Sequence, residues 1–229
     1  MKTDVLYQPA FALARCAIEP GEQLRAEAGA MVAMSSNIEI QTSATGGMLK
    51  SLKRSFLGGE SFFMNTFTAA DGPGEILFGA ALPGDVRVLD VSPGPLMVQS
   101  GAFLVAEMDV NVDTKFSGGR GFFATGGLFM LRLEGRGQAV IASYGALHEM
   151  RLAAGQRYTI DTGHVVGFDA NMPYNLRRVG GLKSTLFSGE GFVIDIEGPG
   201  SVLLQTRSQD AFLSWLVPQL PKNGGSSAT

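Results

Sequence analysis

The chain has 229 residues, of which 45% are hydrophobic and only 17% are charged. This size allows a substantial buried core, and the apolar content excludes global disorder. The net charge of −3, without any long block of like charge, argues against nucleic-acid binding, which needs a basic surface. A surface so poor in charge also suggests that part of it is covered by self-association.

The single cysteine, Cys16, cannot form an intrachain disulfide and lies in an apolar alternation typical of a packed thiol. No apolar run reaches the roughly 18 residues of a membrane-spanning helix. Asp4 and Arg15 interrupt any signal-peptide core. These features predict a soluble, cytoplasmic protein.

Residues 1–19 are predicted to form a leading strand, after which three sequence pieces recur in the same order. They are a glycine turn with a strand, an aromatic residue with a glycine turn, and Gly-x-Gly leading into a strand. The first piece lies at 20–33, 82–90 and 154–168, the second at 56–63, 116–123 and 187–193, and the third at 72–78, 135–141 and 198–204. The first glycines of the third piece are 63 residues apart both times (135 − 72 and 198 − 135).

Glycine turns between short alternating strands predict an all-β fold. One such unit has too few strands to bury its own apolar face, so we expect three tandem β-sandwich units in a pseudo-threefold arrangement. The predicted boundaries are 1–79 for the leading strand and first repeat, 80–150 for the second repeat, 151–207 for the third, and 208–229 for a C-terminal helix and flexible tail. All four parts are expected in one compact body.

The helix after the repeats is predicted over 208–217. Ser208 or Asp210 would cap its start, and Pro218 would stop it. From residue 223 the tail is rich in glycine and serine, which is typical of a mobile terminus.

Polar residues alternate with apolar ones at Glu107, Asp109, Asn111 and Asp113. In one strand these side chains would share a face, about 6.5–7 Å apart. One strand alone cannot surround a calcium ion, whose ligands lie at ~2.3–2.6 Å. A solvated strand face is the favoured interpretation, and a cation site is the alternative.

The two histidines, His148 and His164, do not form a His-x-His motif and cannot supply three imidazole ligands. Structural or exposed histidines are therefore favoured over a metal site shared by two protomers. The chain also lacks the Gly-x-Ser-x-Gly nucleophile motif and any phosphate-binding Gly-Lys-Ser/Thr loop. We predict no catalytic residues, no cofactor and no metal, and hence no enzyme.

One compact basic cluster contains Lys50, Lys53 and Arg54, with Leu49, Leu52 and Phe56 roughly opposite at helical spacing. It is either a surface helix covering an edge or a short amphipathic element that contacts anionic lipid or a protein partner. The interaction candidates are the positions at which the three copies differ. They are Lys50, Lys53, Arg54, Glu107, Asp109, Asp113 and His164.

The chain resembles the bacterial branch of the altered-inheritance-of-mitochondria family, a domain of unknown function. The resemblance is carried by 128–137, the Tyr144-Gly145 step, 154–164, 180–191 and 205–208. It implies a fold similar to the trp RNA-binding attenuation protein (TRAP-like), with three short double-stranded β-helix-like domains per subunit and subunits that associate as trimers. The resemblance implies no established activity and no catalytic residues for the bacterial members.

The leading functional hypothesis is a non-enzymatic oligomeric β scaffold or protein-interaction protein, associated with membrane or cell organisation. Its expected partners are other copies of itself, with a trimer favoured, and a protein or peripheral membrane partner. The alternative is a small-molecule-binding module with a ligand held between β units or subunits.

Overall fold

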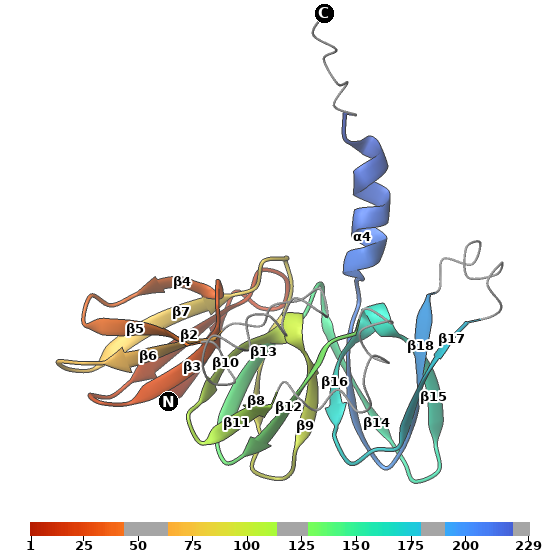
Figure 1. Ribbon diagram of the computed structural model, residues 1–229, viewed down its shortest axis with the longest axis horizontal. Helices are drawn as coiled ribbons and strands as arrows, with labels where there is room; N and C mark the ends of the chain where they lie inside the picture. The colour runs from red at the N-terminus through yellow and green to blue at the C-terminus, as the bar shows by residue number, and fades with distance from the viewer. Residues whose placement is uncertain (44–63, 114–127, 180–190, 222–229) are drawn as a thin grey trace, which may run out of the picture.

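A computed structural model describes residues 1–43, 64–113, 128–179 and 191–221 (Figure 1). The described residues form nineteen strands, three short 3-10 turns and one α-helix near the C-terminus. The all-β class with a short C-terminal helix is therefore confirmed.

The strands fall into three groups along the chain, preceded by β1 (Lys2–Leu6). The first group contains β2 (Leu13–Ile18), β3 (Gln23–Glu27), β4 (Met31–Met34), β5 (Ile38–Ser43), β6 (Met64–Ala69) and β7 (Gly74–Gly79). The second contains β8 (Val86–Asp90), β9 (Leu96–Gln99), β10 (Phe103–Glu107), β11 (Val110–Asp113), β12 (Met130–Gly135) and β13 (Gln138–Ala142). The third contains β14 (Leu147–Leu152), β15 (Arg157–Asp161), β16 (Val165–Asp169), β17 (Tyr174–Arg178), β18 (Phe192–Glu197) and β19 (Gly200–Gln205).

Each group of six strands has the same pairing. The first strand pairs with the sixth and the sixth with the third, as in β2-β7-β4, β8-β13-β10 and β14-β19-β16. The second pairs with the fifth and the fifth with the fourth, as in β3-β6-β5, β9-β12-β11 and β15-β18-β17. The third strand has a register shift at the same place each time, between Met31 and Ala33, Phe103 and Val105, and Val165 and Gly167.

Neighbouring groups share sheets. Strand β10 of the second group pairs with β3 of the first, and β16 of the third pairs with β9 of the second, which gives two six-stranded sheets. No strand of the described first group pairs with one of the third. Within one chain the groups therefore lie in a row (Figure 1) and do not close the expected threefold arrangement.

The buried core follows these junctions. Leu104 and Val105 of the second group belong to the apolar cluster of the first group, and Val166 of the third belongs to that of the second. The third strand of each later group thus completes the core of the group before it. Because interiors are close-packed, this arrangement makes each junction a continuous core rather than a loose domain contact.

Two predicted elements need correction. Residues 1–19 form two strands, and the second of them, β2, is an integral strand of the first sandwich because it pairs with β7. The glycine-turn piece at 82–90 covers β8, the first strand of its group, whereas 20–33 and 154–168 cover second and third strands. The Pro-Gly or Ala-Gly step that the three pieces share is therefore followed by a strand at a different position in the group, first in one case and second in the other two.

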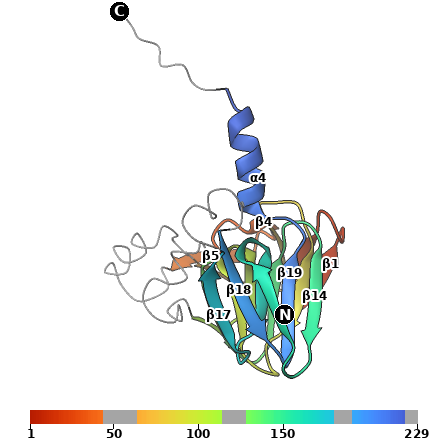
Figure 2. The same ribbon diagram turned by 90° about the vertical axis from the view of Figure 1, so that its right-hand side faces the viewer.

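The predicted C-terminal helix is confirmed as α4 (Gln209–Leu216), whose start is capped by Ser208 Oγ accepting from Ala211 N–H. Pro218 does not end the helical turns at once, since Val217–Gln219 continues as a 3-10 turn. The helix projects from the body of the molecule in both views (Figures 1 and 2).

Candidate functional site

A cleft of about 420 Å³ lies where the corners after β3, β9 and β15 come together. Equivalent glycines, Gly29, Gly101 and Gly163, line it from the three groups. The first turn of α4 forms part of the wall through Gln209 and Asp210. Most of the lining residues are small, with glycine, alanine, serine or threonine side chains.

One wall of the cleft is held together by Gln205, a buried polar side chain. Its Nε2 donates to the Gly163 carbonyl at 2.9 Å, and its Oε1 accepts from Tyr144 N–H at 2.9 Å. These bonds tie the end of β19 to the segment between β13 and β14 and to the η2 turn (Thr162–His164). Glu27 and Asp210 add carboxylates to the lining, and its described residues include neither lysine nor arginine.

His164 closes the η2 turn next to this cleft. Its Nδ1 lies 2.7 Å from the backbone oxygen of Gln205, so the imidazole contributes to the same junction. His148 lies on β14 and is exposed. His148 lies opposite Leu204, so the two histidines flank the same end of β19 from different strands.

The prediction of one continuous acidic strand over 107–113 is wrong. Strand β10 ends at Glu107, a turn covers Met108 and Asp109, and β11 begins at Val110 in a different sheet. Asn111 and Asp113 share the outer face of β11, but Glu107 does not lie beside them. The alternation of polar residues in the sequence continues across the turn because Asp109, within the turn, is also polar.

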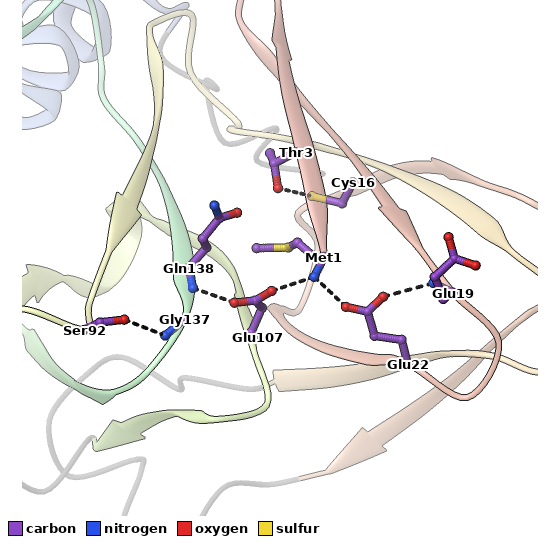
Figure 3. Close-up of polar contacts among 9 residues, drawn as sticks. All are labelled: Met1, Thr3, Cys16, Glu19, Glu22, Ser92, Glu107, Gly137 and Gln138. Carbon is purple, nitrogen blue, oxygen red and sulfur yellow. Dashed lines mark hydrogen bonds and ion pairs between the residues drawn. The ribbon is translucent and has the colours of Figure 1, made fainter.

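Glu107 instead belongs to a polar cluster at the junction of the first two groups (Figure 3). Its Oε1 and Oε1 of Glu22 each lie 2.5 Å from the amino group of Met1. Burial lowers the pKa of that amino group, but hydrogen bonds to Glu107 and Glu22 outweigh the burial and raise it above its ordinary value. Burial likewise opposes the charge of Glu22, yet the bond to the amino group lowers the pKa of this carboxyl.

The basic cluster of Lys50, Lys53 and Arg54 lies outside the described residues, as do most of the aromatic-glycine pieces. Among the described residues, no group of three or more His, Cys, Asp and Glu side chains could hold a metal ion. No helix in the described part of the chain is long and apolar enough to cross a membrane.

Sequence reasoning missed an exposed apolar strand. All four residues of β4 are exposed, with Val32 at 57%. The equivalent residues of β10 and β16 are buried, because a neighbouring group covers them. Aligning 24–34 with 96–106 and 158–168 would have revealed the shared apolar strand, but not its exposure.

Helix α4 is the second exposed apolar element. Phe212 contacts Tyr144 with ring centroids 6.0 Å apart, while Trp215 is 63% exposed. No residue of the helix is buried. Exposed apolar groups gathered on one element are typical of interaction surfaces.

The architecture defines a protein of three fused six-stranded β-sandwiches. The family model for mitochondrial biogenesis AIM24 matches residues 3–207, and the chain belongs to this family. An uncharacterized protein of Streptococcus pyogenes serotype M6 is 27% identical over 219 residues, which cover 92% of this chain and 88% of the relative. A crystal structure of a protein from Streptococcus pyogenes matches with a TM-score of 0.80 at 24% identity, over 96% of this chain and 99% of that one. The family resemblance is thus confirmed, and neither the family description nor these names gives an enzymatic activity.

Proposed function

We propose that this protein is a non-enzymatic, cytoplasmic scaffold that acts as a homo-oligomer, with a trimer favoured. The single observation that carries the proposal is the exposure of the apolar strand β4, whose counterparts β10 and β16 are buried. Exposed sheet edges in monomeric proteins are usually protected by charge, proline or bulges. Strand β4 contains neither charge nor proline, and its register shift is shared by β10 and β16, which pair with a preceding group all the same. The three groups of strands are best explained as three diverged copies of one TRAP-like unit. Because these units already pack against one another within the chain, the same surfaces would serve contacts between chains.

A protein-binding role agrees with the second exposed element, α4. Its apolar side chains would contact a protein or peripheral membrane partner and leave the β body free to assemble. The chain would then act through its surfaces, without chemistry of its own.

Sedimentation velocity at micromolar concentration tests this proposal. We expect wild type to sediment as an oligomer and Val32→Arg to shift toward the monomer, because a charge cannot be buried without a partner. Ile40→Arg, at an exposed apolar residue of β5, is the matched control and should retain the wild-type coefficient. A wild-type chain that sediments as a monomer would contradict the proposal.

The corner cleft favours a second candidate, the binding of a small polar molecule between the β units. Its volume of about 420 Å³ lies within the range of ligand sites. The carboxylates of Glu27 and Asp210 favour a neutral or cationic ligand over an anion.

Gly101→Leu tests this candidate, because a Cβ at Gly101 meets nothing within 4 Å and would extend into open space. Gly94→Leu is the matched control, since Gly94 is equally open and does not line the cleft. Native mass spectrometry of protein purified from its own cells should show a small-molecule adduct on wild type and Gly94→Leu only. Absence of any adduct, or its retention by Gly101→Leu, would exclude this site.

A further inference from the structure

The first group has one strand more than the other two. Strand β1 pairs antiparallel with the edge of β2 that faces away from β7, and it also contacts β8 across the first junction. In the part of the chain that the structure describes, no strand takes this place beside β8, which ends its six-stranded sheet. The second group therefore has a free strand position where the first group has β1.

A groove of about 290 Å³ lies at this free position, between the second and third groups. Residues 87–90 of β8 form one wall, and 96–98 of β9 and 167–169 of β16 form much of the rest. Apolar side chains, among them Leu89 and Phe168, line the groove together with charged ones. The groove thus combines apolar contact area with a few polar groups, as ligand sites do.

The free edge of β8 offers backbone hydrogen bonds. Val91 N–H bonds to the Gly137 carbonyl, on the side of β13. Because successive residues of a strand turn their N–H and C=O groups to opposite sides, Val88 presents both of its groups to the free edge. Gln8 Nε2 donates to the Val86 carbonyl on this same edge at 2.9 Å. An extended peptide that adds a strand is the occupant that such an edge fits.

Strand register relates the groove to the surface that β1 covers. Cys16 corresponds to Leu89 in this register. Their partners in the sixth strands, Ile76 and Ala139, each lie four residues after the first glycine of a Gly-x-Gly piece (76 − 72 and 139 − 135). Thr3 lies opposite Cys16, so a segment that occupies the groove as β1 does would place its third residue opposite Leu89.

The start of β1 shows which chemistry this position takes (Figure 3). The Met1 side chain packs against the first-group core, and its amino group lies beside Glu107. Asp169 holds the place of Glu107 in the groove, since each accepts a hydrogen bond from the start of the sixth strand of its group. The charged residues that line the groove are Arg87, Asp90, Glu149 and Asp169. Three carboxylates against one guanidinium favour a cationic ligand.

We propose that the groove beside β8 binds the amino-terminal segment of a partner protein. The segment lies extended along β8, with an apolar first side chain in the groove and its free amino group beside Asp169. It takes the place at the second junction that β1 takes at the first. The site uses neither β4 nor α4, so it goes beyond the scaffold proposal and does not depend on the oligomeric state.

Disulfide capture by the full chain tests the site. The probe is the peptide Met-Lys-Cys-Asp-Val-Leu, which is residues 1–6 with cysteine in place of Thr3, activated as a mixed disulfide. In the variant Leu89→Cys the protein thiol lies opposite the peptide cysteine, and thiol–disulfide exchange joins them. Mass spectrometry should show capture at least about tenfold faster than by Val88→Cys, whose side chain packs toward the first-group core. Wild type, with only the buried Cys16, should show none.

The amino group is tested with the N-acetylated probe, which Leu89→Cys should capture about tenfold more slowly. Asp169→Asn, added to Leu89→Cys, removes the charge but keeps an oxygen for Ser201 N–H, and it should slow capture similarly. Asp210→Asn, in the corner cleft, is the matched control and should have no effect. Equal capture by Leu89→Cys and Val88→Cys, or of the free and acetylated probes, would overturn the peptide site.

Discussion

Glu107 Oε2 accepts a hydrogen bond from Gln138 N–H at 2.6 Å, which ties the end of β10 to the start of β13. The other two groups have the same bond at the equivalent place. Asp169 Oδ2 accepts from Ser201 N–H at 2.8 Å, and Ser35 Oγ accepts from Glu75 N–H at 2.9 Å. A side-chain oxygen at the end of each third strand thus accepts a hydrogen bond from the start of the sixth strand. This bond and the ion pair with the Met1 amino group explain Glu107 without a metal ion or a second protein.

Glu107→Ala should lower the free energy of unfolding by about 1–3 kcal/mol, because it leaves the part-buried Gln138 N–H without an acceptor and removes one of the two carboxylates paired with the Met1 amino group. Urea unfolding monitored by circular dichroism measures the loss. Asn111→Ala, on the exposed face of β11, is the control and should change stability by less than about 0.5 kcal/mol. Equal effects of the two substitutions would contradict the structural role.

Glu149 joins the second and third groups through Arg87, with Arg87 Nη1 and Glu149 Oε2 2.9 Å apart. The hydrogen bond from Arg151 and the charges of both arginines hold the pKa of Glu149 below its ordinary 4.5. The ion pair therefore adds stability above pH 4.5, and this stability is lost as the pH falls through the lower folded-state value.

Glu149→Gln should accordingly cost up to about 1 kcal/mol at pH 7 and almost nothing at pH 2. Urea unfolding of wild type and variant at both pH values gives the difference. Arg87→Gln combined with Glu149→Gln should cost less than the sum of the single changes. A loss of stability in Glu149→Gln that grows toward low pH would contradict the predicted direction of the pH dependence.

Cys16 is fully buried in β2, and this burial raises the pKa of its thiol to about 11. Because the thiolate is the reactive form, the native protein should react with Ellman's reagent at least tenfold more slowly than the denatured chain. Absorbance at neutral pH with and without guanidinium chloride measures both rates. Complete labelling of native protein at the denatured rate would show that β2 is not packed as described.

Gly135 precedes the turn into β13 with φ +134°, and a Cβ there would lie 2.1 Å from the Asp109 carbonyl oxygen. Gly135→Ala should therefore destabilise the protein by roughly 1–3 kcal/mol through backbone strain and steric contact. Gly94→Ala, where a Cβ meets nothing within 4 Å, should be nearly neutral. Thermal unfolding compares the two, and indistinguishable melting temperatures would contradict the turn geometry.

The all-β class was accessible from the sequence because strand alternation and turn glycines are local signals. The Gly-x-Gly pieces at 72, 135 and 198 do mark equivalent turns, since β7, β13 and β19 follow them. The prediction of one acidic strand face over 107–113 was wrong because the residue pattern does not show where β10 ends and β11 begins.

The exposed edge could not be predicted because it depends on long-range pairing. Met31–Met34 has the apolar character of a buried strand, and only the pairing of β10 and β16 with preceding groups shows that β4 has no such neighbour. The cleft is equally non-local, since Gly29, Gly101 and Gly163 are separated by more than sixty residues of chain.

The mass of the intact chain in solution tests the central claim most directly. Size-exclusion chromatography with light scattering at micromolar concentration should give a multiple of 24.2 kDa, with a trimer near 73 kDa (3 × 24.2) favoured. A mass that stays at 24.2 kDa over the whole concentration range would contradict assembly through the exposed strand β4, and with it the scaffold proposal.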